Sequence, residues 1–424
     1  MRNTVIVGAQ WGDEGKGKVI DVLARRADYI VRYQGGNNAG HTVVTGNETF
    51  ILHLVPSGVL HQKKICIIGN GVVVDPQALM DELAFLRNKG IDVSGRFMIS
   101  EEAHVIFPYH RRLDELRELK KTNRIGTTKR GIGPCYADKI NRIGIRVVDL
   151  MNDRVFKEKL RYNIEVKNEI LSKIFNVGTF SFDEMYKEYT KHAEAIRPYV
   201  ANTTVILNDA IKKKKKIIFE GAQGALLDID HGTYPFVTSS SATAGGACTG
   251  AGIGPSKIDK VIGVVKAYTT RVGEGPFPTE FSKNLMGEIR VKGNEFGATT
   301  GRPRRCGWFD AIVVKHSIMV NGIDEVAVTK LDVLDDLEKI KICTSYKYQG
   351  KTITDFPTDM DIMMKCQPVY EEVPGWKEDT TRITSYVKLP KNAKNYLKLL
   401  RKMLEIKIIL VSVGSERRQT FVLE

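Results

Sequence analysis

The chain has 424 residues, 42% of them hydrophobic, so it can bury a large core. Its formal charge of +14 fits nucleotide substrates, nucleic acid or merely a lysine-rich proteome, and composition alone does not choose among them. The six cysteines form no C-x-x-C pair, which argues against a disulfide framework or a structural zinc site. No run approaches the roughly 20 apolar residues of a membrane span, and no secretory segment opens the sequence, so we expect a cytoplasmic protein.

Short apolar runs alternate with longer helical patterns along the chain. Such alternation predicts an α/β fold with a large, mainly parallel central sheet flanked by helices. The expected strands are residues 4–8, 29–33, 65–69, 217–220, 261–265, 326–329 and 408–413.

No linker or internal repeat divides the sequence, so we predict one large α/β domain over residues 1–424. A helix-rich excursion is expected within it, at about 104–216. Residues 155–174 and 184–200 carry the helical periodicity of that excursion, and residues 126–133 form a glycine-rich loop.

The first chemical motif follows the first predicted strand and opens an expected helix at residues 19–26. It reads Gly12-Asp13-Glu14-Gly15-Lys16-Gly17-Lys18. Glycine amides, a helix N-terminus and lysines together bind phosphate, so we predict a P-loop-like phosphate site. An ordinary P-loop has a Mg-binding Ser or Thr where this chain has Val19. Asp13 is the nearest hard oxygen ligand, and it is either a metal ligand or a base toward a substrate proton.

A second polar loop, residues 34–42, follows the second predicted strand and ends in Gly40, His41 and Thr42. His41 has no apolar periodicity around it. It is therefore a candidate catalytic acid or phosphate contact, with a structural role as the alternative.

Two later segments suggest binding of a guanine base and of an acid. Lys330 and Asp332 follow the predicted strand 326–329, where one carboxylate can accept from the adjacent N1–H and N2–H of guanine. This favours GTP over ATP, and a surface charge pair is the alternative. Residues 297–305 combine arginines with glycine and threonine, which suits a carboxylate or phosphate, and a solvated basic loop is the alternative.

Six blocks of sequence resemble the adenylosuccinate synthetase family, in order and from one end of the chain to the other. They are residues 11–18, 34–42, 126–134, 228–235, 294–301 and 329–333. The resemblance implies a carbon–nitrogen ligase that joins IMP and L-aspartate to adenylosuccinate in AMP biosynthesis. GTP would phosphorylate O6 of IMP to give 6-phosphoryl-IMP, and GDP and phosphate would be released.

The resemblance also implies catalytic roles. Asp13 is the expected base toward the N1 proton of IMP and, with the carbonyl of Gly40, the expected ligand of one Mg²⁺ per subunit. His41 is the expected acid that stabilises the phosphoryl group. Lys16 and Gln223 complete the expected catalytic set.

Three sets of binding residues follow from the same resemblance. The GTP set is Gly12, Asp13, Glu14, Gly15, Lys16, Gly17, Lys18, Gly40, His41, Thr42, Arg304, Lys330, Leu331, Asp332, Ser412, Val413 and Gly414. The IMP set is Asp13, Glu14, Gly15, Lys16, Asn38, Ala39, Gly40, His41, Thr128, Arg142, Gln223, Thr238, Val272 and Arg302. The aspartate set is Ala298, Thr299, Thr300, Gly301, Arg302, Pro303 and Arg304. Arg142 is expected to reach the IMP of the partner subunit in a homodimer.

Two other classes of protein share some of these features. A GTPase switch or transport ATPase would have a phosphate loop, but it would not need the acid-binding segment 297–305. A nucleic-acid-binding protein would share the charge, but the sequence has no RNP-like motif, zinc-finger spacing or heptad-linked basic helix. We therefore expect neither a nucleic acid nor a membrane as a partner.

Overall fold

A ten-stranded sheet forms the centre of the computed structural model, which describes residues 3–46, 48–120, 125–297 and 301–423. The strand order is β20-β19-β15-β11-β1-β10-β2-β5-β7-β9, and every neighbouring pair is parallel except β19 with β20. The strands are β1 (Thr4–Gly8), β2 (Tyr29–Arg32), β5 (Ile65–Ile68), β7 (Phe97–Ser100), β9 (Val200–Ala201), β10 (Ile217–Glu220), β11 (Lys260–Lys266), β15 (Glu325–Thr329), β19 (Lys407–Ser412) and β20 (Thr420–Val422).

The central strands are apolar on both faces because helices cover both faces of the sheet. In β1, Val5 and Val7 pack into one hydrophobic cluster, whereas Ile6 between them packs into the other. All three side chains are fully buried. Successive side chains of a strand point to opposite faces, so this single strand joins both halves of the core.

All seven strands expected from the sequence lie in this sheet, and the predicted fold class is confirmed. The sequence patterns missed β7, β9 and β20. Two of these, β9 and β20, have two and three residues, which is too short for a period-2 pattern to stand out.

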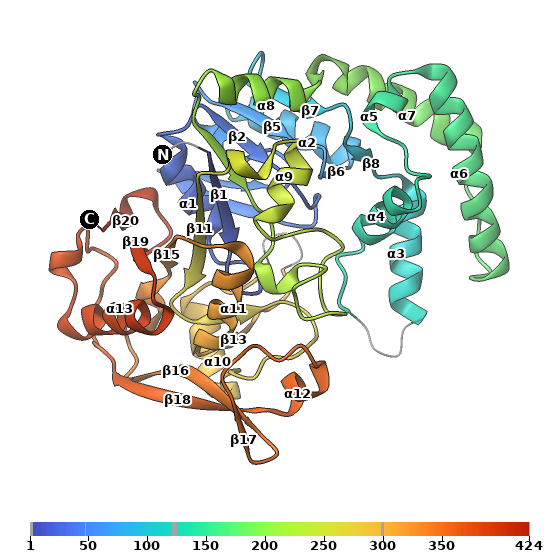
Figure 1. Cartoon of the computed structure of the whole chain (residues 1–424). Coiled ribbons are helices and arrows are strands. Elements are labelled where there is room, and N and C mark those ends of the chain that lie inside the picture. Colours follow the sequence, from blue (N-terminus) through green and yellow to red (C-terminus); the bar gives the residue numbers. More distant parts are fainter. Residues whose placement is uncertain (1–2, 47, 121–124, 298–300, 424) are drawn as a thin grey trace.

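Helices lie on both sides of the sheet, with α6 at one flank of the molecule and α13 at the other (Figure 1). They are α1 (Lys16–Ala24), α2 (Pro76–Asn88), α3 (Pro108–Lys120), α4 (Ile132–Ile140), α5 (Val147–Leu150), α6 (Asp153–Lys173), α7 (Phe182–Ile196), α8 (Thr203–Lys212), α9 (Gly245–Ala251), α10 (Lys283–Lys292), α11 (Ala311–Asn321), α12 (Met360–Lys365) and α13 (Lys391–Leu404). The short 3₁₀ helices are η1 (Ser57–Leu60), η2 (Arg197–Tyr199), η3 (Ala225–Leu227), η4 (Pro255–Lys257), η5 (Leu331–Leu334), η6 (Tyr386–Lys388) and η7 (Arg417–Gln419).

Two predicted helix boundaries were wrong. The first helix begins at Lys16 rather than at residue 19, because Gly15 adopts a left-handed conformation (φ 84°) and caps it. The helix α7 ends at Ile196 rather than at residue 200, because Pro198 lacks the N–H that would continue it.

Smaller sheets and hairpins complete the fold. A second sheet is formed by β14 (Phe309–Asp310), β16 (Lys339–Tyr348), β17 (Lys351–Ile353) and β18 (Gln367–Pro374). The remaining pairs are β3 (His41–Thr45) with β4 (Glu48–Leu52), β6 (Val73–Val74) with β8 (His104–Val105), and β12 (Thr269–Arg271) with β13 (Arg305–Gly307). Among the described residues, no helix combines the length and apolar character needed to cross a membrane.

Candidate active site

Most of the predicted site residues lie just beyond the carboxyl ends of parallel strands. Because β1, β2, β10, β15 and β19 run in the same direction, the loops that follow them meet at one edge of the sheet. These loops are residues 9–15, 33–40, 221–224, 330–332 and 413–414. This edge is the usual ligand-binding position in open α/β sheets.

The phosphate loop presents its amides to an anion. Gly12 and Gly15 have positive φ angles of 86° and 84°, and Asp13 also lies in the left-handed region, with φ 59°. The fully buried Glu14 carboxylate accepts from the Gly12 amide at 2.8 Å and from Lys16 Nζ at 2.7 Å. A loop whose amide and lysine already converge on one carboxylate has the donors that a phosphate needs. Gly17 and Lys18 lie in the first turn of α1, where the helix dipole adds positive potential.

His41, at the start of β3, lies against this helix and pairs with Glu220 at the end of β10. A Cβ on Gly17 would lie 3.0 Å from the His41 Cβ, so the His41 backbone and Cβ lie close to the start of α1. His41 Nδ1 forms a short hydrogen bond with Glu220 Oε1, and the same carboxylate accepts from the Ser57 amide and hydroxyl, both at 2.9 Å. The buried His41 Nε2 makes no hydrogen bond within the described part of the chain.

The charges of this pair follow from its burial. Burial lowers the pKa of His41 and outweighs the Glu220 carboxylate, which acts in the opposite direction. Burial also works to raise the pKa of Glu220, but the contacts with His41 and Arg32 outweigh it and lower that pKa. A neutral imidazole that donates from Nδ1 to an ionised carboxylate is the result, and its Nε2 is left for a substrate.

Gln223 lies between the loops at residues 9–15 and 33–40. It adopts a left-handed backbone (φ 57°), and its Nε2 donates to Asn38 Oδ1 at 3.2 Å. Its Oε1 accepts from Gln34 Nε2 at 3.1 Å. A Cβ on Gly12 would lie 3.6 Å from the Gln223 backbone, so this residue also contacts the phosphate loop. The predicted Asn38 and Gln223 are therefore brought together. Of the residues that follow Asn38, Ala39 and Gly40 are half-buried and Thr42 is exposed.

The Asp13 carboxylate forms an ion pair with Arg304, with 2.7 Å between Oδ2 and Nε. The Asp13 side chain is 32% exposed, whereas that of Arg304 is 9% exposed. Arg304 Nη1 in turn contacts Glu295 Oε2 at 2.6 Å. The predicted base and the predicted acid-binding arginine thus touch each other, and a buried carboxylate that the sequence reasoning did not select holds the arginine.

Lys330 and Asp332 lie at the end of β15 with different surroundings. Lys330 Nζ donates to the Gly293 carbonyl at 2.5 Å and to Glu295 Oε1 at 2.8 Å. Asp332 Oδ1 is buried and has no hydrogen-bond partner among the described residues. Burial, assisted by Asp335, raises the pKa of Asp332 to about 6. A buried carboxylate oxygen without a donor suits the N1–H and N2–H of guanine.

Lys18 joins the C-terminal segment to the phosphate loop. Its Nζ donates at 2.7 Å to the Ser412 hydroxyl and, at the same distance, to the Gly414 carbonyl. Burial lowers the pKa of Lys18 to about 8, although Asp332 acts to raise it. The predicted Ser412 to Gly414 segment, near Leu331 in η5, therefore lies at the same edge as the motif that begins at Gly12.

Another group of predicted residues surrounds the glycine-rich loop before α4. Arg302 Nη1 donates to the Gly126 carbonyl at 3.2 Å, and a Cβ on Gly126 would lie 3.3 Å from the Gly273 Cα. Thr128 and Val272 are close neighbours of these two glycines in sequence, and both side chains are half-buried. Thr238 is half-buried in the turn that follows η3, and Gly301 and Pro303 are exposed.

Two groups of predicted binding residues are not placed at this sheet edge by the described residues. Arg142 is exposed just after α4, with a left-handed backbone (φ 63°). The predicted aspartate contacts Ala298, Thr299 and Thr300 lie outside the described residues.

The sequence reasoning missed the carboxylates that support the site. Glu220 belongs to a polar, glycine-rich segment, but its partner His41 is 179 residues away in sequence. Glu295 lies in the block 294–301 that resembles the family, but neither it nor its buried partner Lys266 was assigned a role. For Glu220 and Lys266, the available signal was a charged residue at the end of an apolar strand.

The predicted Mg²⁺ ligands are the Asp13 carboxylate and the carbonyl of Gly40. Within residues 3–46, 48–120, 125–297 and 301–423, no group of three or more His, Cys, Asp or Glu side chains forms a metal cage. Mg²⁺ in nucleotide sites is held by one or two carboxylates together with substrate phosphates and water. The partly exposed Asp13 carboxylate, beside the phosphate loop, fits that pattern.

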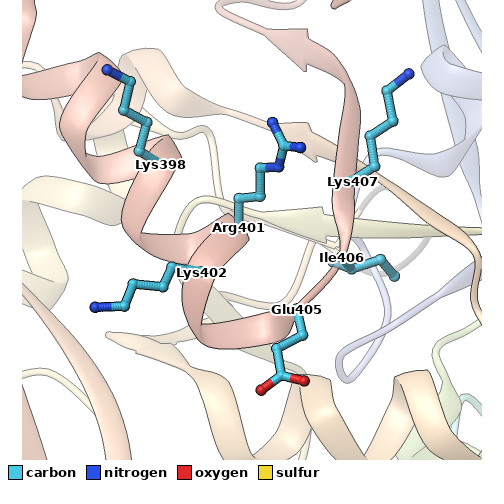
Figure 2. Close-up of a pocket in the computed structure, with 6 residues that line it drawn as sticks. All are labelled: Lys398, Arg401, Lys402, Glu405, Ile406 and Lys407. Carbon is cyan, nitrogen blue, oxygen red and sulfur yellow. The ribbon is translucent and has the colours of Figure 1, made fainter.

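Two cavities lie away from this edge. One, of about 390 Å³, is lined by Lys398, Arg401, Lys402, Glu405, Ile406 and Lys407, where α13 ends (Figure 2). A helix C-terminus carries partial negative charge and offers carbonyl groups, so we do not place a nucleotide phosphate there. The other, of about 430 Å³, lies at the opposite ends of the strands, beside Thr4, Lys260 and Glu325.

Comparison with known proteins gives a consistent result. The family model for adenylosuccinate synthetase matches residues 5–421. The adenylosuccinate synthetase of Desulforamulus reducens is 55% identical over 425 residues, covering 100% of this chain and 99% of the relative. That of Thermoanaerobacter pseudethanolicus is 57% identical over 424 residues with the same coverage.

Solved structures extend the comparison. The fully ligated adenylosuccinate synthetase of Plasmodium falciparum superposes with a TM-score of 0.95 at 39% identity, and each chain is covered completely. The succinoaminodeoxyadenylate synthetase of cyanophage S-2L, bound to dGMP and dATP, has a TM-score of 0.63 at 20% identity, over 100% of this chain and 95% of that one. The second likeness concerns the fold alone.

Proposed function

The chain belongs to the adenylosuccinate synthetase family, and from that membership we propose how its own residues carry out the reaction. It is a GTP-dependent ligase that joins IMP and L-aspartate to adenylosuccinate, with release of GDP and phosphate, in AMP biosynthesis. The observation that carries the assignment of roles is the meeting of the phosphate loop, the His41–Glu220 pair and the Lys330–Asp332 segment at one sheet edge.

In the first step we assign Asp13 as the base that removes the N1 proton of IMP. The resulting anion makes O6 nucleophilic toward the γ-phosphorus of GTP, and the bond to the β–γ bridging oxygen breaks. Phosphoryl transfer depends mainly on positioning and on neutralising charge, which Lys16 and the amides of the phosphate loop supply. Gln223, between Asn38 and the loop, is placed to hold the purine.

His41 acts on the phosphoryl group in transit. In the free protein its imidazole is neutral, because burial lowers its pKa. An arriving phosphate brings negative charge to the unpartnered Nε2, which raises that pKa and favours the protonated form. Glu220 stabilises the imidazolium through Nδ1, so Nε2–H donates to the phosphoryl oxygens.

In the second step the aspartate amine attacks C6 and phosphate leaves. Arg302 and Arg304 are the cations that we assign to the carboxylates of aspartate. Arg304 already pairs with Asp13, so a substrate carboxylate would share or replace that contact. Asp332 and Lys330 hold the guanine, which supports GTP rather than ATP as the phosphoryl donor.

We assign one Mg²⁺ per subunit to Asp13 and the Gly40 carbonyl, completed by GTP phosphates. When bound, the ion neutralises phosphate charge and orients the γ-phosphoryl group. Removal of divalent ions with EDTA should abolish turnover, and excess Mg²⁺ should restore it.

A homodimer is the proposed assembly, in which Arg142 reaches the IMP site of the partner subunit. Arg142 is exposed, and the neighbouring Ile140 is 77% exposed at the end of α4. Both side chains are therefore accessible to a partner subunit, as the proposed role of Arg142 requires.

Phosphate release tests the function directly. It is measured with Mg²⁺, GTP, IMP and aspartate, then with each substrate omitted and with ATP in place of GTP. Release that needs all three substrates, with an equal amount of adenylosuccinate, is the expected result. Hydrolysis that ignores IMP and aspartate would instead indicate a GTPase or ATPase.

A further inference from the structure

Glu295 is a fully buried carboxylate at the centre of a cluster of cations. It lies just after α10, and its two oxygens accept from Lys266 Nζ at 2.8 and 2.9 Å and from the Tyr268 hydroxyl. Burial alone would raise its carboxyl pKa, but Lys266, Lys330 and Arg304 outweigh burial and hold that pKa far below its usual range. Glu295 is therefore ionised in the folded protein, and its single negative charge offsets part of the positive charge of Lys266, Lys330 and Arg304.

Two of these cations belong to the predicted binding sets. Arg304 Nη1 lies 2.6 Å from Glu295 Oε2, and Lys330 Nζ lies 2.8 Å from Oε1. Through Nε, the same arginine reaches Asp13. The Glu295 carboxylate thus contacts Lys330, which is assigned to GTP, and Arg304, which is assigned to GTP and aspartate. Through Arg304 it is also linked to Asp13, the proposed base.

We propose that Glu295 is a positioning residue that fixes Arg304 and Lys330 together and so joins the aspartate and guanine subsites. This inference rests on the proposed function, because it takes the ligands of Arg304 and Lys330 from that assignment. Glu295 is too deeply buried to touch a substrate, so it acts through these two side chains.

The physical reason is pre-organisation. Arginine and lysine side chains lose rotamer freedom when they bind a ligand, and a buried anion that already fixes them removes that cost. Without its charge, Lys266, Lys330 and Arg304 would share a low-dielectric space with the Asp13 carboxylate, which pairs with Arg304, as the remaining counter-ion, and Arg304 and Lys330 would move apart. Lys266, which is fully buried, has a pKa lowered to about 8 by burial and would lose its proton most easily.

The test is Glu295→Gln, which keeps the shape of the side chain and removes its charge. We expect the KM for aspartate to rise by about tenfold and the KM for GTP by severalfold, since charge-assisted contacts are lost. The KM for IMP should change least. Because a neutral Gln among three cations can prevent folding, Glu295→Asp is the second variant. It keeps the charge but withdraws it from Arg304 and Lys330, and the same KM values should rise by a smaller factor.

Asp310→Asn is the matched control. Asp310 is also a fully buried carboxylate with a tyrosine partner, Tyr346 at 2.6 Å, but it caps α11 and touches none of the proposed substrate contacts. Its variant should lower Tm without changing any KM.

A folded Glu295 variant with a lowered Tm and wild-type KM values for aspartate and GTP would make the role merely structural and overturn the proposal. Failure of the proposed function is a separate result, because the wild-type protein would then form no adenylosuccinate in the same assay.

Discussion

Asp13 and Asp332 are both carboxylates assigned to the nucleotides, yet the fold gives them different surroundings. Asp13 is partly exposed and has a cation, Arg304, within ion-pair distance. Asp332 is largely buried and has an oxygen without a hydrogen bond among the described residues. Asp13 is therefore suited to exchange partners during a reaction. Asp332 is suited to accept hydrogen bonds from the fixed pair of N–H donors on guanine.

Replacing Asp13 with Asn should abolish turnover while leaving the fold intact. The amide cannot take a proton from N1 of IMP, and we expect kcat to fall by about a thousandfold or more. Because the Asp13 side chain is partly exposed, we expect the Tm to change little. Steady-state turnover with a thermal melt checks both points, and a near-normal kcat would remove Asp13 from the base role.

The KM for GTP should depend on pH through Asp332. Burial raises the pKa of this carboxyl to about 6, so it is ionised above pH 6 and protonated below it. Guanine needs the ionised form as an acceptor. In the range below pH 8, where Lys18 keeps its proton, the KM for GTP should therefore be flat down to about pH 6 and rise by up to about tenfold per pH unit below it. Asp332→Asn is the control. It should remove this pH dependence and weaken the preference for GTP over ITP, which lacks the 2-amino group.

At the scale of the elements, the start of α1 decides how the phosphate loop works. The helix begins three residues earlier than the sequence predicted, so Lys16, Gly17 and Lys18 belong to its first turn. The left-handed Gly15 allows this early start. Periodicity of apolar residues did not reveal it, because these three residues are not apolar.

Replacing Gly15 with Ala should weaken GTP binding through the backbone. A Cβ there would lie 3.5 Å from the Thr329 side chain, so space is available, but φ 84° costs a non-glycine residue about 1–2 kcal/mol. We expect kcat/KM for GTP to fall by about tenfold.

Gly350→Ala is the matched control for that experiment. Gly350 has φ 76° in the turn between β16 and β17, and a Cβ there would meet no atom within 4 Å. Both variants should lose a similar amount of Tm, but only Gly15→Ala should change kcat/KM for GTP. Equal kcat/KM values for GTP in the two variants would contradict a role for the Gly15 conformation in GTP binding.

At the scale of the whole molecule, two variants that are inactive alone should restore activity when mixed. If Arg142 completes the partner's site, Asp13→Asn and Arg142→Ala homodimers each lack a working site. A mixed dimer has one site free of both substitutions. After subunit exchange, half of the dimers are mixed, so about a quarter of wild-type activity should return. Light scattering should give the mass of a dimer, and mixtures that stay inactive despite exchange would contradict the shared site.

The single-domain organisation with a helical excursion at about 104–216, and the cytoplasmic location, stay predictions. Nothing in the fold or the comparisons tests them.

The sequence by itself determined the family, the fold class and the loops of the site. Seven strands could be found because their apolar runs differ from the surrounding sequence, and strands that run parallel bring their following loops to one edge. The motif from Gly12 to Lys18 could be found because phosphate binding needs glycines and lysines at close spacing along the chain.

Only the tertiary structure decided which charged groups support those loops. Glu220 pairs with His41 across 179 positions, and Glu295 with Arg304 and Lys330 across 9 and 35. A buried charge is stabilised by whichever partner the fold brings within hydrogen-bond distance, and spacing along the chain does not determine that distance.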